Sequence, residues 1–209
     1  MAEPILVSAA VEGLVDEAVV RRIIQEVGGY TGPVYGKNGK ASLSHKIKGY
    51  NQAAMYRPWL VIVDLNHEVD CAPLLRATWL PDPAAYMCFR VAVRTVEAWL
   101  LADYERLSEF MNVDAGRIPK DPEKLADPKK TLVELARHSR SSVMREDMVP
   151  RSGSGRLVGP AYTSRLIEFV TNVEEGWRPP VAAECSRSLN HCLQRLRKLL
   201  LMAVHRECV

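Results

Sequence analysis

The sequence has no long apolar run. No stretch approaches the roughly 18 consecutive apolar residues that a membrane span requires, and the opening MAEP is not followed by the basic and apolar regions of a secretion signal. The cysteines number 5, an odd total, and none of them forms a CxxC pair. We therefore expect a cytoplasmic protein with reduced thiols and no membrane association.

A strong excess of charge is missing as well. The formal net charge of +3 over 209 residues is too small to indicate nucleic-acid binding by itself. Internal repeats and low-complexity tracts are also absent. The composition that is present, 47% hydrophobic and 25% charged residues, is typical of a globular chain long enough to bury a core.

The first half of the chain alternates apolar segments with amphipathic ones. Short apolar runs that predict buried strands occupy residues 5–11, 34–35, 59–64 and 88–93. Residues 16–27 have apolar positions at helical spacing, whereas residues 36–50 are rich in glycine and lysine and predict a basic loop. Strands that alternate with helices over short connections predict an α/β fold with a largely parallel central sheet flanked by helices.

The second half of the chain has a different character. A polar, proline-punctuated stretch at residues 112–130 is followed by segments with helical spacing. These segments predict a C-terminal α-helical lobe over residues 118–209, added to an α/β core over residues 1–117. The helix predicted for residues 94–110 belongs to the core in this division.

Carboxylates follow two of the predicted strands. Glu12 comes directly after the first strand, Asp16 falls in the first turn of the next helix, and Asp64 ends the strand at residues 59–64. Ligands gather beyond the carboxyl ends of parallel strands, and hard oxygen ligands suit Mg²⁺ or Mn²⁺, so the pattern is compatible with a divalent-metal site. A second interpretation stays open, in which Asp16 and Glu17 stabilise the helix dipole and Asp64 begins a turn.

Three short motifs resemble a known family. They are VEGLVDE at residues 11–17, VIVDLN at residues 61–66 and RTVEAWLLAD at residues 94–103, with a weaker match in DPKKTL at residues 127–132. Glu-Gly after a first strand, followed by an apolar strand that ends in an Asp-x-Asp-like motif, resembles the TOPRIM domain of topoisomerases, primases and overcoming-lysogenization-defect (OLD) nucleases. The chain is most similar to a family of small bacterial TOPRIM-like proteins of unknown function, related to the RloB group.

The resemblance implies a metal site and its ligands. Glu12 matches the TOPRIM glutamate, Asp16 the helix carboxylate of OLD-type nucleases, and Asp64 the first aspartate of the paired motif. These residues are expected to bind Mg²⁺ or Mn²⁺. Asn66 stands where the second aspartate belongs; its amide oxygen can ligate the ion, but with one negative charge fewer.

Further residues are candidates for the same crevice. Glu68 or Asp70 would replace the missing aspartate charge. Glu97, in the RTVEAWLLAD helix, is a catalytic candidate, with the alternative that it is a helix-surface residue paired weakly with Arg94. Arg94, or a lysine of residues 37–48, would neutralise charge that develops on a phosphate; for the lysines, a solvated charged face is the alternative interpretation.

The resemblance also predicts a function. It is Mg²⁺-dependent hydrolysis of phosphodiester bonds in nucleic acid, by a nuclease that acts as the effector of an anti-phage defence system with an ATPase partner. The alternative is a non-catalytic TOPRIM-like subunit that docks on a partner ATPase and regulates it. Asn66 favours the alternative, and the surviving Glu12, Asp16 and Asp64 favour the enzyme. The sequence leaves open DNA or RNA as the substrate, and a monomer or a homo-oligomer as the assembly state.

Overall fold

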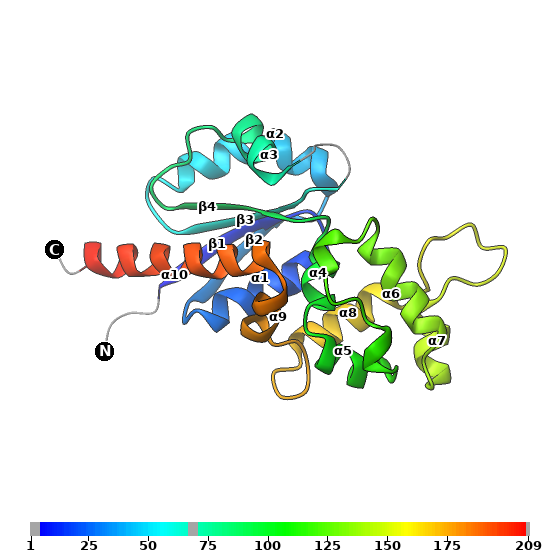
Figure 1. Cartoon of the computed structure of the whole chain (residues 1–209). Helices are drawn as coiled ribbons and strands as arrows, with labels where there is room; N and C mark the ends of the chain where they lie inside the picture. The colour runs from blue at the N-terminus through cyan, green and yellow to red at the C-terminus, as the bar shows by residue number, and fades with distance from the viewer. Residues whose placement is uncertain (1–4, 67–70, 208–209) are drawn as a thin grey trace. The chain divides into compact units, whose positions relative to one another are not determined.

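The computed structural model describes residues 5–66 and 71–207, and the chain forms two compact units (Figure 1). The sheet unit comprises residues 1–93 and 188–209, and the helical unit comprises residues 94–187. The elements of the sheet unit are β1 (Leu6–Val11), α1 (Leu14–Glu26), β2 (Tyr30–Gly36), α2 (Gly39–Ala53), β3 (Trp59–Asp64), α3 (Ala72–Trp79), β4 (Met87–Ala92) and α10 (Arg187–Glu207). Those of the helical unit are α4 (Val96–Leu101), α5 (Tyr104–Met111), α6 (Pro128–Arg137), α7 (Ser142–Met148), α8 (Tyr162–Thr171) and α9 (Pro179–Cys185), with 3₁₀ turns at Ala115–Arg117 and Pro122–Lys124. Within the described residues, no helix combines the length and the apolar character that a membrane crossing requires.

The sheet unit is built on a 4-stranded parallel sheet in the order β2-β1-β3-β4. In the register of the central pair, Ala9 of β1 lies opposite Leu60 of β3. Helices α2 and α3 cover one face of the sheet, and α1 and α10 cover the other (Figure 1). The predicted α/β class, with a parallel central sheet flanked by helices, is confirmed.

Both faces of the sheet are buried, which explains why β1 and β3 are apolar without alternation. On the face of α2 and α3, the core includes Leu43, Ile47, Val61, Val63, Leu75, Met87, Phe89 and Val91. Successive strand residues point to opposite faces, so the next positions along the strands meet α1 and α10. Fully buried residues of this second core are Val7, Ala9, Ile23, Ile24, Leu60, Ile62, Leu196 and Leu199.

Most of residues 36–50 are helical, so the prediction of a basic loop there is wrong. Helix α2 spans Gly39–Ala53, and its buried residues are Leu43 and Ile47, four positions apart on one face. Tyr50 and Ala53 also pack against this core, but the lysines, serines and glycines between these positions weaken the periodic pattern. The helix is stabilised mainly by packing on the sheet, which local sequence does not report. The preceding strand β2 also extends beyond the predicted residues 34–35.

The boundary between the units differs from the predicted division at residue 117. The helix predicted for residues 94–110 opens the helical unit, and it is divided into α4 and α5 at Asp103. The last helix returns to the sheet unit, where the N–H of Val93 donates to Oγ of Ser188 at 3.3 Å. An amphipathic sequence shows which face of a helix is apolar but not which element covers that face, so α10 could not be assigned to the sheet from sequence.

Candidate functional site

The carboxyl ends of β1 and β3 form the topological switch point of the sheet. β1 continues into α1 on one face, and β3 continues toward α3 on the other face (Figure 1). In open α/β sheets, ligands bind where adjacent strands diverge in this way. Glu12 directly follows β1 and Asp64 is the last residue of β3, so both predicted ligands lie at the switch point.

A hydrogen bond joins these two residues. The backbone N–H of Asp64 donates to Oε1 of Glu12 at 2.8 Å, across adjacent parallel strands. The backbone of Glu12 is held in turn, because the N–H of Gly39 donates to its carbonyl oxygen at 3.0 Å. Glu12 and Asp64 therefore lie close together at the ends of adjacent parallel strands.

The other two carboxylates of the VEGLVDE motif have different environments. Asp16 is buried in the first turn of α1, with 7% of its surface exposed. Glu17 pairs with Arg21 at 2.8 Å and with Lys37 at 3.0 Å. Burial raises the pKa of Glu17, but the hydrogen bonds and charges of Arg21 and Lys37 outweigh burial and hold that pKa below its ordinary value. Glu17 is thus an ion-pair partner, and Asp16 is the buried carboxylate of the motif.

Two of the candidate lysines lie near the ends of the strands. Lys37 directly follows β2, and Lys40 lies in the first turn of α2. Nζ of Lys40 donates to the carbonyl oxygen of Leu65 at 3.4 Å, so its ammonium group reaches the segment after β3. Lys46 and Lys48 are exposed farther along α2. Lys37 and Lys40 therefore bring positive charge to the edge that holds the carboxylates.

Unusual backbone conformations also follow the strands. Lys37 (φ 68°) comes after β2, Asn66 (φ 53°) after β3 and Arg94 (φ 65°) after β4. A positive φ is uncommon outside glycine, and it costs on the order of 1–3 kcal/mol where surrounding structure imposes it. Such conformations cluster at ligand sites in proteins. Lys37 and Asn66 thus mark the carboxyl edge of the sheet as a place where backbone geometry has been constrained.

The donors at this edge suit a hard divalent cation. Glu12, Asp16, Asp64 and Asn66 all carry side-chain oxygen atoms. Oxygen atoms are the ligands that Mg²⁺ prefers. Mg²⁺ that acts on phosphates is usually held by one or two carboxylates together with water and substrate oxygens, an arrangement that the Glu12–Asp64 pair fits. In the part of the chain that the structure describes, no three histidine, cysteine or acidic side chains form a cluster for a metal ion. Glu68 and Asp70 lie outside the described residues.

Glu97 belongs to the helical unit, and the alternative that it lies on a helix surface is wrong. The residue is 4% exposed, and the hydroxyl of Tyr162 donates to its Oε1 at 3.4 Å. Nζ of Lys129 lies 3.6 Å from the same oxygen. The three residues come from α4, α8 and α6, so this polar network connects three helices. Arg94, at the start of the helical unit, has the left-handed backbone described above.

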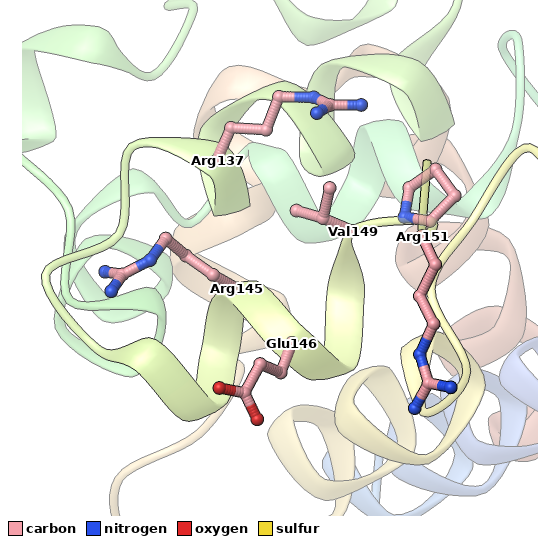
Figure 2. A pocket seen from close by; sticks show the side chains of 6 residues that line it. Arg137, Arg145, Glu146, Val149 and Arg151 are labelled. Carbon is pink, nitrogen blue, oxygen red and sulfur yellow. The ribbon is translucent and has the colours of Figure 1, made fainter. Parts of the chain in front are cut away.

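The sequence prediction missed a hollow of about 580 Å³ in the helical unit (Figure 2). Its lining residues are Arg137, Arg145, Glu146, Val149, Pro150 and Arg151. The signal in the sequence is the segment RSGSGR at residues 151–156, which has an arginine at each end. By composition this segment is a connection between helices. The sequence does not show that its arginines lie beside those of α6 and α7.

No protein-family model, characterised protein or solved structure matches the chain. The assignment of a function therefore depends on the geometry of the carboxyl edge and on the chemistry of its side chains. That chemistry combines carboxylates at a switch point with nearby lysines, which is suited to a divalent cation and a phosphate group.

Proposed function

We propose that the chain is a TOPRIM-like, Mg²⁺-dependent nuclease that hydrolyses phosphodiester bonds in nucleic acid. The hydrogen bond from the N–H of Asp64 to Glu12 supports this proposal most directly, because it holds two acidic residues together at the switch point of a parallel sheet. The buried Asp16 and the nearby Lys40 add to that support. We further propose that the enzyme works in the cytoplasm, as the effector of an anti-phage defence system with an ATPase partner.

Each residue at the carboxyl edge has a distinct role in this proposal. Glu12 and Asp64 would hold the ion, with Asp16 and the amide oxygen of Asn66 as the further predicted ligands. A bound Mg²⁺ would polarise the scissile phosphate and lower the pKa of a water molecule. Lys40, whose ammonium group reaches the segment after β3, neutralises charge on the phosphate.

A non-catalytic subunit that docks on an ATPase and regulates it is the second candidate, and Asn66 favours it. Asn66 has a φ of 53°, in the left-handed region that asparagine tolerates better than most residues. The backbone therefore provides a reason for asparagine at this position that is independent of metal binding. A site without the second aspartate charge holds a cation less firmly, which is adequate for recognition of a ligand without cleavage.

Metal binding and cleavage together test the proposal. Calorimetric titration with Mn²⁺ compares the wild type with Glu12→Gln, in the absence and in the presence of a short oligonucleotide. Cleavage of labelled DNA and RNA is then assayed with Mg²⁺, with and without the candidate ATPase. Glu26→Gln, in the last turn of α1, removes the same charge from the same part of the chain and is the matched control.

We expect the wild type and Glu26→Gln to bind Mn²⁺ and to cleave at least one nucleic acid. Glu12→Gln should lose affinity for Mn²⁺ by about 10-fold and cleavage by about 100-fold or more. Unchanged cleavage in Glu12→Gln would contradict the mechanism. A wild type that binds Mn²⁺ and the ATPase but cleaves neither DNA nor RNA would support the regulatory subunit instead.

A further inference from the structure

Three arginines from three segments line the hollow in the helical unit. Arg137 ends α6, Arg145 and Glu146 lie on α7, and Arg151 belongs to the loop after α7. Figure 2 shows the three arginine side chains around Val149. Among the described residues of this lining, Glu146 is the one that is acidic, so the hollow of about 580 Å³ has a surplus of positive charge.

A second hollow of about 410 Å³ adjoins the first, because Arg151 lines both. The remaining residues of its lining are Ser154, Arg156, Val158 and Pro160. The second hollow thus adds a fourth arginine and no further acidic residue among those that the structure describes. None of the described residues that line either hollow is aromatic.

The two loop arginines are available to a ligand. The side chains of Arg151 and Arg156 are exposed and form no hydrogen bond or ion pair with any residue that the structure describes. Arg145 donates to a backbone carbonyl, and Arg137 pairs with Glu134 at 3.2 Å on the surface of α6. An exposed ion pair of this kind contributes little to stability, so Arg137 can exchange Glu134 for another anion.

The loop that carries Arg151 and Arg156 is anchored at its base. The N–H of Gly159 donates to the carbonyl oxygen of Met148 at 2.9 Å, and the N–H of Ala161 donates to that of Asp147 at 2.9 Å. A side chain at position 159 would clash, because its Cβ would lie 2.3 Å from the carbonyl oxygen of Asp147. The chain is therefore held where it leaves α7 and where it enters α8, while the segment between these points is exposed.

We propose that the two hollows bind the phosphodiester backbone of a nucleic-acid strand, independently of base sequence. Guanidinium groups donate paired hydrogen bonds to phosphate oxygens. Adjoining hollows with an arginine in each match successive phosphates of one strand. Bases of single strands are held by stacking on aromatic side chains, and the described lining offers none, so the contact is made to phosphate. This site lies in the helical unit and does not require the cleavage proposed above.

Binding is measured without divalent metal, so that the proposed metal site does not contribute. Fluorescence anisotropy of labelled mixed-sequence DNA and RNA oligonucleotides is recorded in EDTA over roughly 50 to 200 mM salt, where phosphate contacts show their salt dependence. The test variant is Arg151→Gln/Arg156→Gln. The matched control is Arg117→Gln/Lys120→Gln, which removes two exposed charges from the same unit but from outside both hollows. Adenosine monophosphate and inorganic phosphate serve as competitors.

We expect Arg151→Gln/Arg156→Gln to weaken binding of both oligonucleotides by about 10-fold at the lowest salt concentration, and the control to weaken it by about twofold at most. The slope of log affinity against log salt should fall in magnitude by about 1.4, or about 0.7 for each lost contact to a single strand. The measurement in EDTA leaves out the proposed metal ion, which separates this site from the proposed nuclease centre. Equal losses of oligonucleotide affinity in the two double variants would overturn the proposal. So would displacement by adenosine monophosphate or phosphate as effective as displacement by unlabelled oligonucleotide, because that result identifies a site for small phosphates.

Discussion

The backbone N–H of Asp64 donates a hydrogen bond of 2.8 Å to Oε1 of Glu12, so the end of β3 is fixed to the residue that follows β1. Glu12 therefore has a structural role in addition to the metal-binding role proposed for it. The two roles use different properties of the side chain. The hydrogen bond needs an acceptor oxygen, whereas a cation needs the negative charge.

The first prediction separates these roles through stability. Glu12→Ala removes the acceptor of the Asp64 N–H, and the unfolding free energy should fall by about 1–3 kcal/mol. Glu12→Gln keeps an acceptor oxygen at the same distance from the backbone. The unfolding free energy of this variant should therefore fall by about 1 kcal/mol or less. Urea unfolding followed by circular dichroism measures both values in metal-free buffer. Equal losses in the two variants would show that the hydrogen bond contributes nothing to stability.

The sheet was predictable from sequence because its strands are buried on both faces. β1 and β3 are continuous apolar runs, and their parallel pairing follows from short connections through helices. The proximity of Glu12 and Asp64 follows in turn, since parallel strands end at the same edge. Helix α2 was not predictable, because its few core-packed side chains are separated by residues with the composition of a loop.

The environment of each acidic side chain was harder to predict. Glu17 takes its ion-pair partner Lys37 from the segment after β2, and this contact exists only once β1 and β2 are paired. Glu97 lies three positions after Arg94, a spacing that is typical of an ion pair on a helix surface. Its hydrogen-bond partner is Tyr162, which is 65 positions away in sequence. Contacts of this kind depend on tertiary packing, which local periodicity does not encode.

The second prediction concerns Asp103, which is fully buried between α4 and α5. Its carboxylate accepts hydrogen bonds from the backbone N–H of Arg178 at 2.9 Å and from the guanidinium at 3.0 and 2.6 Å. Asp103→Asn keeps the shape but removes the charge that faces Arg178. The unfolding free energy should fall by about 2–4 kcal/mol, less than for a fully buried pair because the Arg178 side chain is 32% exposed.

Asp121→Asn is the matched control for this measurement. Asp121 pairs with Lys124 at 3.0 Å, with side chains 70% and 81% exposed. An exposed pair of this kind contributes little, so the control should lose less than about 1 kcal/mol. Denaturant unfolding of both variants gives the comparison. A loss in Asp103→Asn no larger than that in Asp121→Asn would contradict a stabilising role for the buried carboxylate.

The third prediction concerns thiol reactivity. Burial raises the pKa of Cys88 to about 11 and raises that of Cys192 well above its ordinary value, whereas Cys71 and Cys185 are exposed. The thiolate is the reactive form, so iodoacetamide at pH 8 should modify Cys71 and Cys185 in the folded protein and spare Cys88 and Cys192. Peptide mapping by mass spectrometry, with a denatured sample as control, reads each site separately. Modification of Cys88 at the rate of Cys71 would contradict its burial in the sheet.

The last prediction concerns stability at high pH. Burial, together with the charge of Glu97 and the hydrogen bond to it, raises the pKa of Tyr162 well above its ordinary value of about 10. Above that pH the unfolded chain loses the Tyr162 proton while the folded chain retains it, so folding stability falls as pH rises. Tyr162→Phe has no proton to lose. At neutral pH this variant should be about 1 kcal/mol less stable than the wild type, because the hydrogen bond to Glu97 is absent.

As pH rises above about 10, the stability gap between the wild type and Tyr162→Phe should narrow by up to about 1.4 kcal/mol per pH unit. Urea unfolding at pH 8, 10 and 11 measures the gap. Tyr56→Phe, which removes the hydroxyl of a tyrosine that is 76% exposed, is the matched control for the chemical change. A gap for Tyr162→Phe that is the same at all three pH values would show that Tyr162 ionises equally in the folded and unfolded chain. That result would contradict the placement of its hydroxyl against the buried carboxylate of Glu97.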